Sequence, residues 1–332
     1  MIKYFSYASF ILAMLLSIMS CNEKPGVDII LTGDYLGQAP PDTLPSIFAP
    51  GVISDGYANR DMAIHPNGDK IFYSILLPKR SGVLMQVNRK NDIWNKPIVA
   101  PFSGKYSDIE PCFSYDGKRL YFASNRPLKD DDPPKDYDIW YVELCDAGWK
   151  EPVNLGSPIN TGANEFYPSI TRDNVLYYTA SYEGNEDIYR SRMIGGKFNK
   201  PQRLGDAVNS ESGEFNAFIS LDETYLIFSS FGREDGFGGG DLYISFKNDS
   251  DDWTKAINMG ERFNSSRLDY CPYISFDGKY FFFTSSRLDN SVNKLKFQKY
   301  NDIVTMQSSP GNGNDDIYWV LAETINKLKA EK

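Results

Sequence analysis

The chain has 332 residues, of which 24% are charged and 41% hydrophobic, and its formal net charge is −9. This composition is typical of a globular protein, and an acidic chain without a basic patch makes nucleic acid an unexpected partner. Aromatic residues make up 14% of the chain, including 22 Tyr and 21 Phe, which favours strands over helices.

The first segment resembles the signal peptide of a bacterial lipoprotein. Lys3 is followed by the apolar stretch FILAMLLSIMS, which is too short to span a bilayer as a permanent helix, and the small residue Ser20 directly precedes Cys21. We therefore expect residues 1–20 to be a signal peptide and Cys21 to carry acyl chains that anchor the protein to the membrane. Asn22 stands where an aspartate is associated with inner-membrane retention, so we expect the outer membrane, at its periplasmic face or at the cell surface. An ordinary signal peptide with an incidental cysteine is the alternative.

Three more cysteines follow the signal: Cys112, Cys145 and Cys271. Because three cysteines cannot all pair within one chain, we expect no disulfide framework. We interpret them as small buried hydrophobic residues.

One motif recurs five times along the chain. The copies are RDMAIHPNGDKIFYS (60–74), EPCFSYDGKRLYFASNR (110–126), YPSITRDNVLYYTAS (167–181), NAFISLDETYLIFSS (216–230) and CPYISFDGKYFFFTSSR (271–287). Their turn positions lie 49, 57, 49 and 55 residues apart and are Asn67, Asp116, Asp173, Asp222 and Asp277. Self-similarity at such a period indicates a repeat architecture.

Each copy is predicted to form two strands joined by a tight turn, with Asn-Gly or Asp-Gly at the turn in copies one, two and five. A third strand is predicted over 138–142, 187–191, 241–245 and 316–320. A fourth follows lead-in stretches such as WKEPVNLG and FNKPQRLG. Four short antiparallel strands per repeat predict an all-β fold, namely a five-bladed β-propeller.

The fifth repeat has no fourth strand of its own, because the chain ends soon after Val320. We predict that the stretch SIFAPGVISDG (46–56) supplies that outer strand and closes the ring. The expected organisation is a signal peptide over 1–20, the lipidated Cys21 and a tether over 21–44, a propeller over 45–325 and a charged tail over 326–332. A sixth, degenerate blade within 22–58 is the alternative, although these 37 residues would also have to contain the tether.

The second repeat, DIEPCFSYDGKRLYFASNRPLKDDDPPKDYDIWYV, resembles the Pro-Asp repeat of TolB-like, WD-like β-propellers. That repeat is marked by a proline, a Ser-x-Asp-Gly turn, a Tyr-Phe strand, a Ser-x-Arg end and a following Asp-Ile-Tyr. The resemblance covers repeats two to five well, whereas the first repeat lacks the proline and the arginine. It implies the propeller fold but no single function, because propellers host many unrelated activities.

Polar residues recur at positions that a propeller would bring to one mouth of its central channel. We call them the predicted ring, which consists of Asn59, Asp108, Glu165, Glu214 and Asp269 at the starts of the innermost strands and Arg126, Arg233 and Arg287 after the second strands. A third column starts the third strands, with Asp138, Asp187, Asp241 and Asp316. The ring could bind a cation or sugar hydroxyls. Alternatively, its carboxylates and arginines tie neighbouring loops together through bidentate hydrogen bonds.

The loops between second and third strands are expanded in repeats two, four and five. The last one has about 27 residues, from Leu288 to Asn314, and contains the basic and aromatic stretch NKLKFQKY. Insertions of that length are normally functional or disordered. Because all three would open on one face, we expect them to form the rim of a binding surface. For the last loop, a solvated flap is an equally good interpretation.

The sequence contains no recognisable catalytic or metal motif. The only histidine, His65, has no Gly-x-Ser-x-Gly nucleophile elbow to serve and is predicted to replace a turn hydroxyl. Zinc-type spacing of His and Cys is absent. The stretches DDD (130–132) and DGFGGGD (235–241) lack the ligand order of an EF-hand, so calcium is a minor alternative and no cofactor is expected.

We therefore expect a monomeric, non-enzymatic, lipid-anchored propeller whose loop-rich face binds an envelope protein or a glycan. The alternative is a carbohydrate-active enzyme, similar to propeller glycosidases, in which carboxylates of the predicted ring act as general acid and as nucleophile or base. Their repeat-equivalent positions weigh against this alternative, because catalytic acids usually break the symmetry of a repeat.

Overall fold

The computed structural model describes residues 30–330 except 130–131, 183, 290–291 and 293–295. The predicted signal peptide and Cys21 lie outside the described residues. All strands belong to one compact unit that begins at Leu31. Within the described part of the chain, no helix is both long and apolar enough to cross a membrane.

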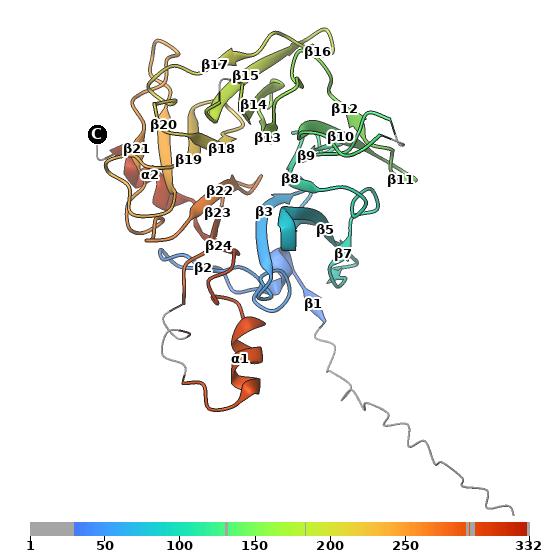
Figure 1. Cartoon of the computed structure of the whole chain (residues 1–332), viewed down its shortest axis with the longest axis vertical. Coiled ribbons are helices and arrows are strands. Elements are labelled where there is room, and N and C mark those ends of the chain that lie inside the picture. Colours follow the sequence, from blue (N-terminus) through green and yellow to red (C-terminus); the bar gives the residue numbers. More distant parts are fainter. Residues whose placement is uncertain (1–29, 130–131, 183, 290–291, 293–295, 331–332) are drawn as a thin grey trace, which may run out of the picture. The chain divides into compact units, whose positions relative to one another are not determined.

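Five antiparallel sheets stand around a central axis, which confirms the predicted five-bladed propeller (Figure 1). Blade one contains β3 (Ala58–Ile64), β4 (Lys70–Leu77), β5 (Ser81–Lys90), β6 (Ile93–Trp94) and β7 (Ile98–Val99), with η2 (Pro78–Arg80) between β4 and β5. Blade two contains β8 (Asp108–Phe113), β9 (Arg119–Ser124), β10 (Asp138–Cys145), β11 (Gly148–Trp149) and β12 (Val153–Asn154). Blade three contains β13 (Glu165–Ile170), β14 (Val175–Ala180), β15 (Asp187–Ile194), β16 (Lys197–Phe198) and β17 (Gln202–Arg203). In these blades the outer strand is split into two short pieces that both pair with the third strand.

The last two blades are simpler. Blade four contains β18 (Glu214–Ile219), β19 (Tyr225–Ser230), β20 (Asp241–Phe246) and β21 (Ile257–Asn258). Blade five contains β22 (Asp269–Ile274), β23 (Tyr280–Ser285), β24 (Asp316–Leu321) and β2 (Ser46–Ile47). In the register of blade five, Ser46 pairs with Trp319 and Ile47 with Tyr318. The N-terminal segment therefore supplies the outer strand that closes the ring, as predicted.

The turns between first and second strands form where the repeat predicts them. Gly68, Gly117 and Gly278 adopt φ values of 70°, 70° and 69°, a left-handed conformation that glycine adopts without steric cost. Blades three and four have no glycine there, and Asn174 and Glu223 take up φ values of 57° and 59° instead. We call the face that carries these five turns the turn face, and the opposite face, with the loops between second and third strands, the loop face.

The chain joins the propeller earlier than the predicted boundary at residue 45. β1 (Leu31–Thr32) pairs with β6 of blade one, and the 3₁₀ element η1 (Asp34–Gly37) follows. The Tyr35 ring lies 4.7 Å from that of Tyr280 in blade five. Residues 31–37 therefore pack on the propeller and are not part of a free tether.

Two helices occupy segments for which the sequence predicts no regular structure. α1 (Tyr300–Gln307) lies within the blade-five insertion. α2 (Glu323–Ala330) follows the last strand, and its Ile325 side chain is buried against blade four and five residues. The predicted charged tail over 326–332 thus begins inside a helix.

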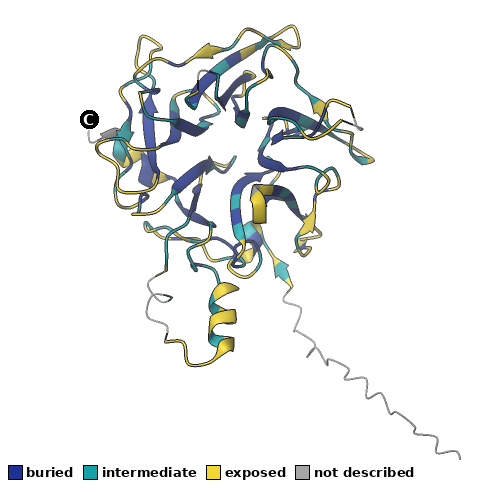
Figure 2. Ribbon diagram, viewed as in Figure 1, coloured by how far each residue is buried: buried dark blue, intermediate teal, exposed yellow. Residues whose placement is uncertain are grey.

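Most residues of the inner strands are buried (Figure 2), and the hydrophobic core is divided among the junctions between blades. Separate clusters of buried apolar side chains lie between blades one and two, two and three, three and four, four and five, and five and one. The second strands β14 and β23 are buried along their whole length. Because each blade buries its two faces against its two neighbours, the ring must be complete for the core to be complete.

Candidate functional site

The ring carboxylates of blades two, four and five are bound within their own blades. The Asp108 carboxylate accepts hydrogen bonds from Ser124 Oγ and Arg126 Nη2, both at 2.6 Å. In the same way Arg233 and Arg287 donate to Glu214 at 2.8 Å and to Asp269 at 2.6 Å. Each arginine also donates to a backbone carbonyl and lies over aromatic rings of its blade. These contacts match the structural interpretation of the column.

Blades one and three depart from this pattern. Asn59 Oδ1 accepts a hydrogen bond from the Asp55 amide. Glu165 accepts hydrogen bonds from the backbone and hydroxyl of Thr161, while its Oε2 has no partner among the described residues. Burial raises the pKa of Glu165 to about 7 because desolvation disfavours the charged form.

The structure does not gather the predicted ring at an open channel mouth. The five side chains at the starts of the innermost strands are fully buried, each with 0% exposure: Asn59, Asp108, Glu165, Glu214 and Asp269. The third column is also bound locally, since Arg203 forms a bidentate pair with Asp187 and the Gly311 amide donates to Asp316. These columns therefore fasten loops to blades.

A fourth column, which was not predicted from the sequence, does converge on the channel. Each innermost strand is interrupted by a bulge two residues after its predicted ring position. The bulge residues have positive φ and are Asp61 (53°), Glu110 (63°), Tyr167 (47°), Asn216 (49°) and Cys271 (53°). For non-glycine residues this conformation costs about 1–2 kcal/mol each, so contacts around the channel must offset it.

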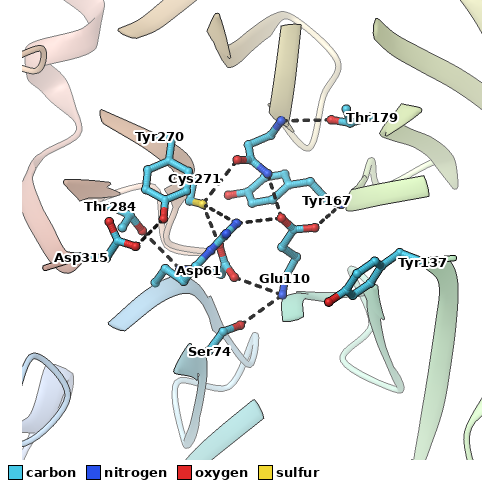
Figure 3. Close-up of polar contacts among 12 residues, drawn as sticks. Asp61, Ser74, Glu110, Tyr137, Tyr167, Thr179, Tyr270, Cys271, Thr284 and Asp315 are labelled. Carbon is cyan, nitrogen blue, oxygen red and sulfur yellow. Dashed lines mark hydrogen bonds and ion pairs between the residues drawn. The ribbon is translucent and has the colours of Figure 1, made fainter. Parts of the chain in front are cut away.

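Those contacts form one polar cluster, which we call the channel network: Arg60, Asp61, Glu110, Tyr167, Asn216 and Cys271 (Figure 3). Arg60 donates to Asp61 and to Glu110, both at 2.8 Å. Glu110 also accepts hydrogen bonds from the Tyr167 amide at 2.7 Å and from Asn216 Nδ2 at 3.0 Å. The Cys271 thiol donates to Asp61. The network therefore joins all five blades through side chains that are buried, apart from Arg60, which is 12% exposed.

Hydroxyl groups on second strands satisfy the amides that the bulges release. The amides of Asp61, Glu110 and Asn216 donate to the hydroxyls of Thr284, Ser74 and Thr179, respectively (Figure 3). In each case the hydroxyl belongs to the blade that precedes the bulge around the ring. Because a buried amide without a partner is costly, these bonds couple the blades to one another.

The pKa shifts of the channel network favour a structural role for its residues over a catalytic one. Burial raises the pKa of Glu110 to about 7, against the opposing effect of Arg60. Burial also raises the pKa of the Cys271 thiol well above its usual value, so it stays protonated and a poor nucleophile. Cys112, Cys145 and Cys271 are not disulfide-bonded, and Cys145 is exposed, contrary to its interpretation as buried.

A cavity of about 230 Å³ opens at the turn-face end of the channel, next to the network. We call it the turn-face cavity. It is lined by Tyr167 of the network and by the residues that follow four of the bulges: Met62, Pro111, Pro168 and Pro272. Its walls are mainly apolar and aromatic and include Phe218, Tyr273, Ile274 and Phe276, whereas Arg172 and Asp222 supply opposite charges. The binding surface predicted from the sequence lies on the opposite, loop face. The recurring prolines were the signal that could have located the cavity.

His65 lies in a smaller recess on the turn face, beside this cavity. Its Nδ1 accepts a hydrogen bond from the Asn67 amide at 3.2 Å, and its ring packs edge-on against Phe113. His65 stands at the position of the turn hydroxyls, but those hydroxyls in blades two and five accept a hydrogen bond from the amide five residues on, whereas His65 accepts one from the amide two residues on. No group of three or more His, Cys, Asp or Glu side chains within the described residues could hold a metal ion.

Known structures share the fold of this chain, whereas its sequence matches no protein-family model and no curated protein. A structure titled glycoside hydrolase aligns with 87% of this chain and 93% of its own at 12% identity, with a TM-score of 0.51. A putative TolB from Agrobacterium tumefaciens aligns with 80% of this chain and 90% of its own at 14% identity, with a TM-score of 0.48. TolB from Acinetobacter baumannii aligns at 15% identity and a TM-score of 0.47.

These findings define the class of the protein. The chain is a five-bladed β-propeller whose blades are four-stranded and whose ring is closed by an N-terminal strand. Solved TolB structures are among its structural neighbours, as the resemblance of its repeats to TolB-like propellers led us to expect. The alignment covers 79% of this chain but only 54% of the Acinetobacter protein, so this chain corresponds to about half of that molecule.

Proposed function

We propose that this protein is a non-enzymatic, monomeric propeller, anchored to the outer membrane through lipid on Cys21, that binds a segment of another envelope protein. The segment inserts an apolar side chain into the turn-face cavity. One observation carries the proposal. A cavity of about 230 Å³ with mainly apolar walls lies at the end of the channel. The polar groups of the channel itself are hydrogen-bonded to one another and leave this cavity as the place for a ligand.

The positions of the carboxylates support binding over glycoside hydrolysis. A glycosidase needs two carboxyl groups that face the sugar, about 5–9.5 Å apart. Here the ring carboxylates are fully buried, and three of them have arginine partners. Asp61 and Glu110 share Arg60 inside the channel network. None of these groups is presented to a substrate in this arrangement.

The walls of the cavity support a protein segment over a glycan. Phe218, Ile274 and Phe276 are only partly buried by the propeller itself and leave apolar surface facing the cavity. Small sites of this kind obtain most of their binding energy from apolar burial and use a few polar groups for orientation. Arg172 and Asp222 are exposed and are placed to bond the backbone of an extended segment.

The experiment compares two matched substitutions on opposite faces. Phe276→Arg places a charge in the turn-face cavity, and Phe237→Arg places one on an exposed phenylalanine of the loop face. Each protein is cross-linked in intact cells, recovered and read by mass spectrometry. The recovered partner is then purified and titrated against both variants, whose melting temperatures are compared with wild type.

We expect Phe276→Arg to lose the partner and Phe237→Arg to retain it. Loss only with Phe237→Arg would instead support the predicted loop-rich face. Recovery of the same partner by both folded variants, or recovery of no specific partner by wild type, would contradict the proposal.

The second candidate for the function of this protein is a carbohydrate-active enzyme, and the properties of Glu165 are the reason. Glu165 has a pKa raised to about 7 and an oxygen without a described partner, which are properties of a general acid. Its complete burial weighs against that role. The test is release of reducing sugar from envelope polysaccharides, which an enzyme would perform and Glu165→Gln would abolish without unfolding.

A further inference from the structure

The blade-five insertion presents a short helix with exposed apolar side chains. α1 (Tyr300–Gln307) has no buried residue. Tyr300, Ile303 and Val304 are 77%, 43% and 46% exposed, and Phe297 just before the helix is 48% exposed. The spacing of 300, 303 and 304 places these side chains on one helical face. Exposed apolar and aromatic side chains gathered on one helical face are a feature that marks an interaction surface.

Hydrogen bonds and a close backbone contact fix the position of α1. Asp302 accepts hydrogen bonds from the backbone amides of Gln298 and Lys299 and so caps the first turn. At the base of the insertion, Asn312 and Asn314 donate to the carbonyl of Gly56. A Cβ on Gly56 would lie 2.6 Å from the backbone of Ser308, so only glycine allows this close approach. α1 is therefore fixed to the N-terminal segment that closes the ring.

The charge near α1 differs from that of the rest of the chain. Lys296 and Lys299 are exposed beside its first turn, on a protein whose formal net charge is −9. Asp302 is engaged by the helix N-terminus. A helix with exposed apolar and aromatic side chains next to lysines is suited to the interface of an anionic bilayer, where the apolar face is buried and the lysines meet phosphates.

The N-terminal chain places a membrane within reach. Nine residues, 22–30, separate Cys21 from Leu31 on blade one, and an extended chain of that length spans about 30 Å. In Figure 1 both β1 and α1 lie on the lower side of the ring, and α1 projects outward from it. A bilayer that contacts α1 would therefore leave both ends of the channel accessible.

We propose that α1 docks on the surface of an anionic phospholipid bilayer and orients the propeller with its channel open to the periplasm or the medium. The proposal rests on the lipid anchor of the proposed function, but not on the turn-face cavity. The anchor retains the protein at the membrane, and α1 supplies the second contact that fixes its orientation.

The test uses the full mature chain with Cys21→Ser, so that no acyl chain contributes. Sedimentation measures its binding to vesicles of phosphatidylglycerol and phosphatidylethanolamine, and to neutral phosphatidylcholine vesicles. The α1 variant is Tyr300→Ser with Ile303→Ser. The matched control is Ile194→Ser with Phe237→Ser, which removes two exposed apolar side chains elsewhere.

We expect binding to the anionic vesicles, a partition coefficient at least about tenfold lower for the α1 variant, and no change for the control. Lys296→Glu with Lys299→Glu should weaken binding most at low salt, because screening then matters least. Absence of wild-type binding, or equal binding by the α1 variant, would overturn the proposal, as would loss of a protein partner by the α1 variant without a vesicle effect. Phe276→Arg should bind vesicles like wild type, so failure of the partner proposal is distinguishable from failure of this one.

Discussion

At the residue scale, Glu165 and Glu214 occupy the same position of neighbouring blades but have different partners. Glu214 is paired with Arg233, whereas Glu165 accepts hydrogen bonds from Thr161 and has no arginine or lysine partner among the described residues. The pKa of Glu165 is about 7 in the folded state, and its ordinary value is 4.5. Between these pH values the folded state binds the extra proton, so stability falls as pH rises.

Glu165→Gln should remove that part of the pH dependence. We expect the variant to be close to wild type in stability at pH 4.5 and more stable than wild type at pH 8, because glutamine cannot ionise in the buried position. Urea unfolding at the two pH values measures the difference. The same decline in wild type and variant would show that Glu165 does not titrate in this range.

Glu214→Gln is the matched control for this prediction. It leaves Arg233 without its ionised partner inside blade four, so it should lower the free energy of unfolding by about 3–5 kcal/mol at both pH values. Equal, small effects of both substitutions would contradict the view that the predicted ring is structural.

At the element scale, the closing strand β2 depends on one side chain. Phe48 directly follows β2, is fully buried, and lies 5.2 Å from the Phe282 ring and 5.1 Å from the Trp319 ring. Phe48→Ala should reduce the free energy of unfolding by about 3–5 kcal/mol, whereas Leu44→Ala, at a side chain that is 69% exposed, should leave it unchanged. Chemical denaturation checks both. If Phe48→Ala does not fold, the milder Phe48→Leu should still be measurably destabilised; no loss in either would contradict closure through β2.

The elements that could be predicted from the sequence are those whose determining residues lie close together along the chain. A turn residue and its two flanking strands lie within one short copy of the motif, and blade five visibly lacked its outer strand. The channel network could not be predicted in this way, because Asp61, Glu110 and Cys271 come from different blades and their position in the repeat is not occupied by one residue type. The only regularity that the sequence shows for these network residues is that each lies two positions after a residue of the predicted ring. α1 and β1 lie outside the repeat, so no copy could be aligned with them.

At the scale of the whole molecule, the blades are not independent folding units. Each of the five clusters at the blade junctions is shared by two blades, and the channel network joins all five blades. Opening one blade therefore exposes two clusters and breaks the network at one point. The blades should consequently share one level of stability, in contrast to a linear repeat array in which each unit contacts only its sequence neighbours.

Amide hydrogen exchange measured by mass spectrometry at neutral pH tests this expectation. The second strands β9, β14, β19 and β23, together with β4, pair on both sides and should be the most protected segments, with similar rates in all five blades. α1 has no buried residue and should exchange far faster, which makes it an internal reference. Phe48→Ala should accelerate exchange in the second strand of each of the five blades. When the ring opens at blade five, the apolar clusters between neighbouring blades become exposed one after another. Acceleration confined to blade five would show instead that the blades open separately.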